Sequence, residues 1–269
     1  MTYLLISLAL LACSTLMLRP IAGRSVANFV MATRTPQTSS AFRIANPVLG
    51  LVFVSIIFLL SSPKWGLALV TAVLLHETGR YLAYRIAGHD DALFRPFPFL
   101  PLTPSSQKAA ATDGIDAFIN LMGASFSLAP MVLIHSLVPF AGEADSPAFK
   151  QLVAIGQTIA AYNFFMLLPL WPLAGGNIAK AVLQGLAPKA VVPFLLAASA
   201  VTAAAGFAWE SGVAVLLWLT GGLVLVGIQP APPTARPMTT KQAFLVIACH
   251  LTLLAAFWKG GSQLIIWLL

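Results

Sequence analysis

Eight apolar runs, separated by short polar connectors, constrain the fold of this chain more than any other feature of its sequence. A helix needs about 20 apolar residues to cross a bilayer, so several of the runs are short and we expect about 6–8 transmembrane helices. Hydrophobic residues make up 59% of the chain and charged residues only 9%, which excludes an ordinary water-soluble globule. The sequence therefore predicts an all-α polytopic membrane protein. The runs cover residues 2–18, 46–62, 65–87, 117–140, 150–170, 190–208, 212–229 and 243–258, and the final IIWLL either extends the last helix or lies at the membrane interface.

The basic residues indicate how the chain is oriented in the membrane. The net charge is +7, but the basic residues are scattered between apolar runs, which argues against nucleic acid as a partner. The loop 19–45 contains four arginines and no acidic residue, so the positive-inside rule places it in the cytoplasm. We expect a multi-pass protein of a bacterial inner (plasma) membrane, in contact with the lipid bilayer, with both termini outside.

The order of the runs divides the chain into three regions. Residues 1–45 hold a first transmembrane helix and the basic cytoplasmic loop, residues 46–190 form a core, and residues 191–269 supply C-terminal transmembrane helices. The first run has no basic residue before it, so we interpret it as a retained span and not as a cleaved signal. The two cysteines, Cys13 and Cys249, both lie in apolar runs and predict no disulfide framework.

One predicted helix, Thr71–Gly88, carries ionisable residues in otherwise apolar surroundings. At 3.6 residues per turn, His76, Glu77 and Arg80 share one face of this helix. Charged side chains at membrane depth are costly and usually face a protein interior or a water-filled cavity, which predicts a functional site. The alternative is a buried Glu77–Arg80 pair that only holds helices together.

A second segment, Ala161–Lys180, interrupts its helix at membrane depth. Pro169 and Pro172 break the helix, and Gly175 and Gly176 allow backbone turns that larger residues resist. Lipid cannot satisfy the amide groups that such a break releases, so the segment must be shielded by protein or line a cavity. This pattern favours a site-forming element.

Together the two segments resemble the site-2 protease family of intramembrane zinc metalloproteases. HETGR stands here in place of that family's HExxH, and PLAGG stands in place of its PLDGG. The resemblance covers approximately residues 50–190 and implies a site-2-protease-like core with a broken helix at PLAGG. The positions that agree in the first segment are His76, Glu77, Gly79, Leu82, Ala83, Arg85 and Gly88, and those in the second are Phe165, Leu167, Leu168, Pro169, Pro172, Leu173, Gly175 and Gly176.

The resemblance also shows which parts of the zinc site are missing. In the family, two histidines four residues apart and an aspartate hold the zinc, and a glutamate polarises the metal-bound water. His76 and Glu77 remain here as a metal ligand and a remnant general base. Arg80 replaces the second histidine and has only donors, and Ala174 replaces the aspartate and has no donor atom. We therefore expect no cofactor and an ion pair in which the Arg80 guanidinium takes the place of the metal cation beside Glu77.

The resemblance also implies residues that border the path along which a substrate or partner enters the site. The segment from Gly88 to Asp116 interleaves phenylalanines with four prolines, which exclude a continuous helix, and in the family this place is thought to border the substrate path. A hydrophobic anchor at the interface is the equally open alternative. Met166 stands where the family has an asparagine, and Asn163, one turn before it, can offer an amide nearby. The path residues we predict are Phe97, Asn163, Trp171, Gly175 and Gly176.

Three functions stay open on the sequence alone. The first is a catalytically inactive site-2 protease homologue that binds a transmembrane partner without cutting it. The second is an active intramembrane metalloprotease that recruits zinc ligands from elsewhere. The third is a transporter or channel-like protein in which the Glu77–Arg80 pair is a gate and the 169–176 segment binds the solute. Candidate ligands for the second function are His89, His135, Asp113 and Asp116.

Overall fold

The structure, a computed structural model, describes residues 62–94, 106, 108, 110–215, 217–218 and 236–269. Within these residues the chain is helical and contains no strand, which confirms the all-α prediction for this part of the chain. The predicted run 2–18, nearly all of 46–62, most of 212–229 and the path residue Phe97 lie outside the described residues.

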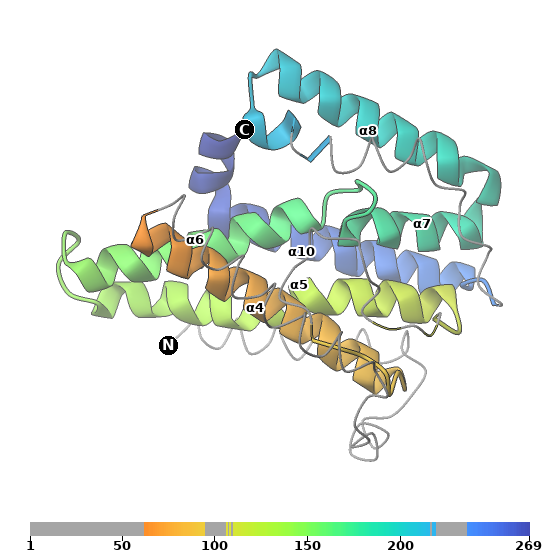
Figure 1. Cartoon of the computed structure of the whole chain (residues 1–269), viewed down its shortest axis with the longest axis horizontal. Coiled ribbons are helices and arrows are strands. Elements are labelled where there is room, and N and C mark those ends of the chain that lie inside the picture. The colour runs from red at the N-terminus through yellow and green to blue at the C-terminus, as the bar shows by residue number, and fades with distance from the viewer. Residues whose placement is uncertain (1–61, 95–105, 107, 109, 216, 219–235) are drawn as a thin grey trace, which may run out of the picture.

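Most of the described helices coincide with predicted apolar runs, but one helix, Ala174–Leu186, lies between the runs 150–170 and 190–208 (Figure 1). The described part of the chain also contains two short 3₁₀ helices: η1 directly follows one α-helix, and η2 directly precedes another. The elements are α4 (Pro63–Ile86), α5 (Asp113–Leu137), η1 (Val138–Phe140), α6 (Pro147–Met166), α7 (Ala174–Leu186), η2 (Pro188–Ala190), α8 (Val191–Ala208) and α10 (Thr240–Leu268).

Local sequence signals fix where several helices begin. The side chain of Thr112 accepts a hydrogen bond from the Ile115 amide at the start of α5, and Ser146 accepts one from Phe149 at the start of α6. The start of α10 is a capping box in which Thr239 and Gln242 each satisfy the other's backbone amide. These caps use amide groups that the first turn of a helix leaves unpaired.

The helices pack around α5, which contacts α4, α6, α7 and α10, while α8 lies apart and packs on α7 (Figure 1). Small residues bring the helix backbones close together, as is common in membrane proteins. A Cβ added at Gly79 of α4 would stand 2.6 Å from the Phe126 Cβ of α5. A Cβ added at Gly261 of α10 would stand 2.8 Å from the Ala160 Cβ of α6.

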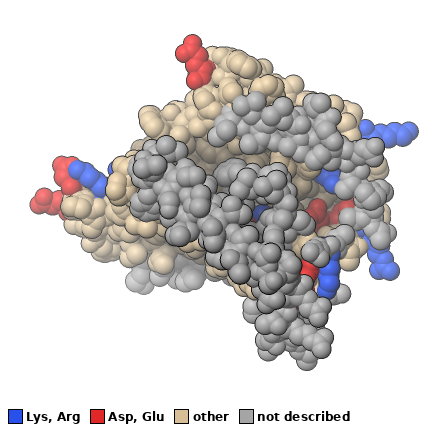
Figure 2. Space-filling model, in the orientation of Figure 1, with Lys and Arg blue, Asp and Glu red and all other residues tan. Residues whose placement is uncertain are grey.

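Three of the described helical segments are long and apolar enough to cross a membrane: Asp113–Phe140, Pro188–Ala208 and Thr240–Leu268. The chain is therefore a membrane protein. On the face that Figure 2 shows, most of the described charged side chains stand toward the two ends of the bundle. The predicted 6–8 spans stay a prediction beyond these three.

The structure decides two expectations about the predicted helices. The final IIWLL extends the last helix, because α10 continues to Leu268. The expected turns at Gly175 and Gly176 are wrong, since both residues lie in the first turn of α7 and the break covers residues 167–173. The glycines are needed for close approach, because a Cβ at Gly175 would clash with the Leu167 carbonyl and one at Gly176 with the Trp171 amide.

Candidate functional site

Helix α4 places His76 and Glu77 inside the bundle, where they are 0% and 2% exposed. The neighbouring helix α5 passes this point with Gly123. A Cβ added there would stand 2.7 Å from His76 Nε2 and 2.9 Å from Arg80 Cγ. Such contacts are too short for a real side chain, so only glycine leaves room for the histidine and the arginine together.

Asn163 of α6 fixes the orientation of the His76 ring. The His76 Nδ1 and Asn163 Oδ1 atoms are 2.8 Å apart, and Asn163 Nδ2 donates to the Ile159 carbonyl at 2.8 Å. Because the amide nitrogen is used in this way, the amide oxygen accepts, and we assign the proton to His76 Nδ1. The Nε2 atom then carries the lone pair. The prediction that Asn163 offers an amide near the site is confirmed.

The predicted ion pair between Glu77 and Arg80 is present. One guanidinium nitrogen, Arg80 Nη1, lies 3.3 Å from Glu77 Oε1 and 3.5 Å from Oε2. The Glu77 side chain is 3% exposed and that of Arg80 is 19% exposed, so the pair is largely shielded from water. A single nitrogen at this distance is a weaker arrangement than the two-pronged contact that arginine makes with carboxylates elsewhere.

Tyr162, which no sequence pattern predicts, completes the group. Its ring meets the His76 ring edge-on, with centroids 5.6 Å apart and an interplanar angle of 85°. In this group, three buried polar atoms have no hydrogen-bond partner among the described residues: His76 Nε2, Arg80 Nε and Tyr162 Oη. We call His76, Glu77, Arg80, Tyr162 and Asn163 the central cluster. No local sequence pattern marks Tyr162, because its place in the site depends on how α6 packs beside α4.

The central cluster does not fit a zinc ion. His76 has the form of a metal ligand, because its Nδ1 is bonded to an oxygen and its Nε2 is unpartnered. Arg80 offers no electron pair, and Ala174, buried at the start of α7, has no donor atom. Among the described residues, no three His, Cys, Asp or Glu side chains gather closely enough to hold a metal.

In the described part of the chain, none of the four other candidate ligands joins His76 in a group of three that could hold a metal. His135 is twelve residues beyond Gly123 on α5, about 18 Å further along the axis, and its Nδ1 bonds to the Met131 carbonyl. Asp113 and Asp116 lie in the first turn of α5, and Asp116 accepts a hydrogen bond from Asn120. His89 follows the end of α4 and bonds to Ser106.

The broken segment between α6 and α7 satisfies much of its own backbone. The Leu170 amide donates to the Leu168 carbonyl at 2.7 Å, and the Leu173 amide donates to the Leu170 carbonyl at 2.8 Å. The Asn177 side chain donates to the Pro172 carbonyl at 3.1 Å. Backbone pairing of this kind is what a helix break inside a membrane would require. A role for Trp171, Gly175 and Gly176 in a partner path stays a prediction.

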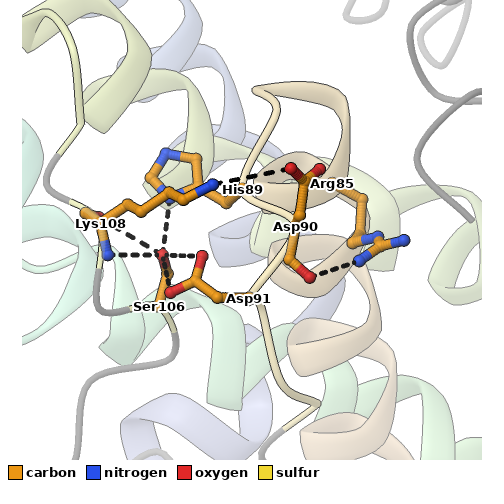
Figure 3. Close-up of polar contacts among 6 residues, drawn as sticks. All are labelled: Arg85, His89, Asp90, Asp91, Ser106 and Lys108. Carbon is orange, nitrogen blue, oxygen red and sulfur yellow. Dashed lines mark hydrogen bonds and ion pairs between the residues drawn. The ribbon is translucent and has the colours of Figure 1, made fainter. Parts of the chain in front are cut away.

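A second polar group lies at the end of α4 (Figure 3). We call it the loop-anchor cluster. The Ser106 hydroxyl lies 2.7 Å from His89 Nδ1, donates to the Asp91 carboxylate at 2.9 Å and accepts from the Lys108 amide at 3.1 Å. It joins residues on both sides of the proline-rich stretch of sequence. Its members are Arg85, His89, Asp90, Asp91, Ser106 and Lys108, with Arg85 Nη1 donating to the Asp90 carbonyl at 2.9 Å and Lys108 Nζ lying 3.6 Å from the Asp90 carboxylate.

Comparisons of this chain with models of protein families, with curated proteins and with solved structures return no match. The fold and the central cluster themselves therefore define the class of protein: a helical membrane protein with a buried histidine, an ion pair and a tyrosine at one point of its interior.

Proposed function

We propose that this chain is a site-2-protease-like membrane protein that is catalytically silent and binds a transmembrane segment of a partner without cutting it. The proposal extends to a multi-pass arrangement of about 6–8 spans in a bacterial inner membrane. It combines the resemblance in the HETGR and PLAGG segments with the geometry of the central cluster.

The contact between Arg80 and Glu77 carries the proposal. In a metalloprotease the glutamate acts on water that a metal ion has made acidic. Here the Glu77 carboxylate is bonded to a guanidinium three residues along the same helix face, 3.3 Å away. A carboxylate held in this way has a permanent cation as its partner, and the guanidinium supplies no site at which water is activated.

The residue that stands in place of the family's zinc-binding aspartate supports the same interpretation. Ala174 is 3% exposed and lies at the first position of α7. A carboxylate buried there without a metal would be an uncompensated charge, which is costly in a low-dielectric interior. The arginine at position 80 and the alanine at position 174 are thus compatible with each other in a metal-free site.

Measurement of zinc in the purified protein tests the proposal. We expect the wild-type chain to hold no stoichiometric zinc, and we expect the double variant Arg80→His, Ala174→Asp to acquire it because that variant restores the ligand set. The matched control is Arg80→Leu, Ala174→Asp, which lacks the second imidazole. Stoichiometric zinc in the wild type that is lost in His76→Ala would overturn the proposal.

Cleavage is the second measurement. A wild-type preparation should leave a transmembrane peptide intact after prolonged incubation, with and without added zinc. Cleavage that disappears in Glu77→Gln would show that the glutamate still acts as a base, and it would exclude a silent protein.

A further inference from the structure

An apolar cavity of ≈320 Å³ lies between α7, α8 and α10, and none of its lining residues belongs to the central cluster. Pro169 of the broken segment borders it, and Ala179 of α7, Phe194 of α8 and Leu251 of α10 contribute to its lining. Phe194 is 41% exposed and Leu251 is 58% exposed, so apolar surface continues from the cavity onto both outer helices. Only 22% of the apolar window of α8 and 28% of that of α10 are buried.

His250 is the polar residue in this lining. Its Nδ1 atom is buried and has no hydrogen-bond partner among the described residues. His250 follows Thr240, where α10 begins, by ten residues, which is about 15 Å along the helix axis. The hydrocarbon core of a bilayer is about 30 Å thick, so the imidazole stands near its middle.

The depth of His250 restricts what can fill the cavity. An acyl chain offers no hydrogen bond to an imidazole, and a phospholipid headgroup stays at the surface of the membrane, about 15 Å away. A transmembrane helix, in contrast, carries hydroxyl and carboxamide side chains to this depth, where they form hydrogen bonds between helices. A cavity of this size accepts a side chain while the rest of such a helix lies against α8 and α10.

We infer that this cavity is the docking site for the partner's transmembrane segment, and that the segment presents a serine, threonine or asparagine side chain to His250. This inference rests on the proposed function, because it names where a bound segment lies. The contact is made outside the central cluster, so recognition of the partner is separate from the remnant of the catalytic site.

Two synthetic transmembrane peptides test the inference. Both are Leu/Ala helices that differ only at the central residue, which is Asn in one and Leu in the other. Their dissociation constants for the full chain in lipid nanodiscs are measured by energy transfer from a label on the protein. One hydrogen bond between membrane helices corresponds to about a threefold difference in affinity, so the wild type should bind the Asn peptide about threefold more tightly.

Two substitutions locate the contact. His250→Leu should abolish the preference for Asn, whereas His135→Leu, a histidine on α5, should retain it. Ala179→Phe fills the cavity and should weaken the binding of both peptides, whereas Ala204→Phe, at an exposed position of α8, should leave both unchanged. A thermal melt of each variant in the same nanodiscs confirms that it is folded.

Three other outcomes would each contradict the inference, and each would show which part of it fails. A preference for Asn that survives His250→Leu excludes the hydrogen bond. Binding of both peptides that is unchanged in Ala179→Phe places the docking site elsewhere and leaves the cavity to lipid, while the proposed binding function stands. If neither peptide binds the wild type, the proposed binding of a transmembrane segment fails together with the docking site.

Discussion

The central cluster and the loop-anchor cluster both lie on or beside α4, but they differ in how completely their polar groups are hydrogen-bonded. At the end of α4, the Ser106 hydroxyl makes contacts of 2.7 to 3.1 Å with His89, Asp91 and Lys108. In the middle of α4, the ion pair is 3.3 Å long and three neighbouring polar atoms lack a partner among the described residues. The more deeply buried cluster is thus the less well satisfied one.

This difference separates a structural role from a functional one. An unpaired polar group costs more free energy the further it is removed from water, so stability alone favours full satisfaction in the interior. The loop-anchor cluster follows that rule. The central cluster does not, and ionisable residues inside a membrane protein commonly belong to functional sites. This contrast is consistent with the proposed function, in which the middle of α4 forms the site and its end has a structural role.

The largest effect should come from breaking the ion pair. In Glu77→Gln the Arg80 guanidinium loses its carboxylate inside the bundle, and removal of one partner from a buried pair costs about 3–5 kcal/mol. A thermal melt in detergent should show a clear decrease in melting temperature. The double variant Glu77→Gln, Arg80→Met should recover much of the loss, because no unpaired charge remains. An unchanged melting temperature in the single variant argues against the pair.

A smaller effect should follow from closing the space beside the pair. The methyl group in Gly123→Ala would stand 2.7 Å from His76 Nε2, and overpacking of this kind costs about 1–3 kcal/mol. Gly212→Ala is the matched control, because no atom lies within 4 Å of a Cβ added there. If the two variants melt at the same temperature, the close contact of α4 with α5 at this point is wrong.

The loop-anchor cluster should be less sensitive. Ser106→Ala removes the hydroxyl that joins His89 to Asp91, but the exposed Asp90 beside it shows that water reaches this end of the helix. We expect a loss of about 0.5–1.5 kcal/mol, the net value of an ordinary hydrogen bond. Ser106→Thr keeps the hydroxyl and serves as the control. A loss as large as that of Glu77→Gln would contradict the contrast between the two clusters.

The smallest effect is expected for the outer ion pair of the loop-anchor cluster. Lys108 and Asp90 are 3.6 Å apart with side chains 55% and 54% exposed. Such surface pairs contribute less than about 1 kcal/mol and are screened by salt. Lys108→Met should leave the melting temperature nearly unchanged at low and high salt. A strong dependence on salt would show that the pair is more shielded than its exposure indicates.

Several elements were predictable from local sequence. The apolar runs predict the positions of α5, α8 and α10, because a bilayer imposes a minimum length that is visible in composition. The ion pair was also predictable, since Glu77 and Arg80 are three residues apart on one helix face. The role of Asn163 could be predicted only from the family resemblance, because the family's asparagine position, Met166 here, lies one turn further along α6.

The remaining features depend on contacts between distant parts of the chain. Nothing in the sequence near Gly123 indicates that His76 lies against it, and Tyr162 becomes notable only when α6 is placed beside α4. The role of Gly175 and Gly176 was predicted wrongly, because glycine serves turns and close packing alike and sequence does not distinguish the two. The bond between Asp91 and Ser106 likewise joins residues fifteen positions apart.

The most direct test of the account is an experimental density map around residue 76, recorded with anomalous data at the zinc edge. We expect continuous density from the Arg80 guanidinium toward the Glu77 carboxylate and no anomalous peak beside His76 Nε2. A peak at about 2.0–2.1 Å from that nitrogen, with tetrahedral ligands around it, would show a zinc site and contradict the replacement of the metal by an arginine.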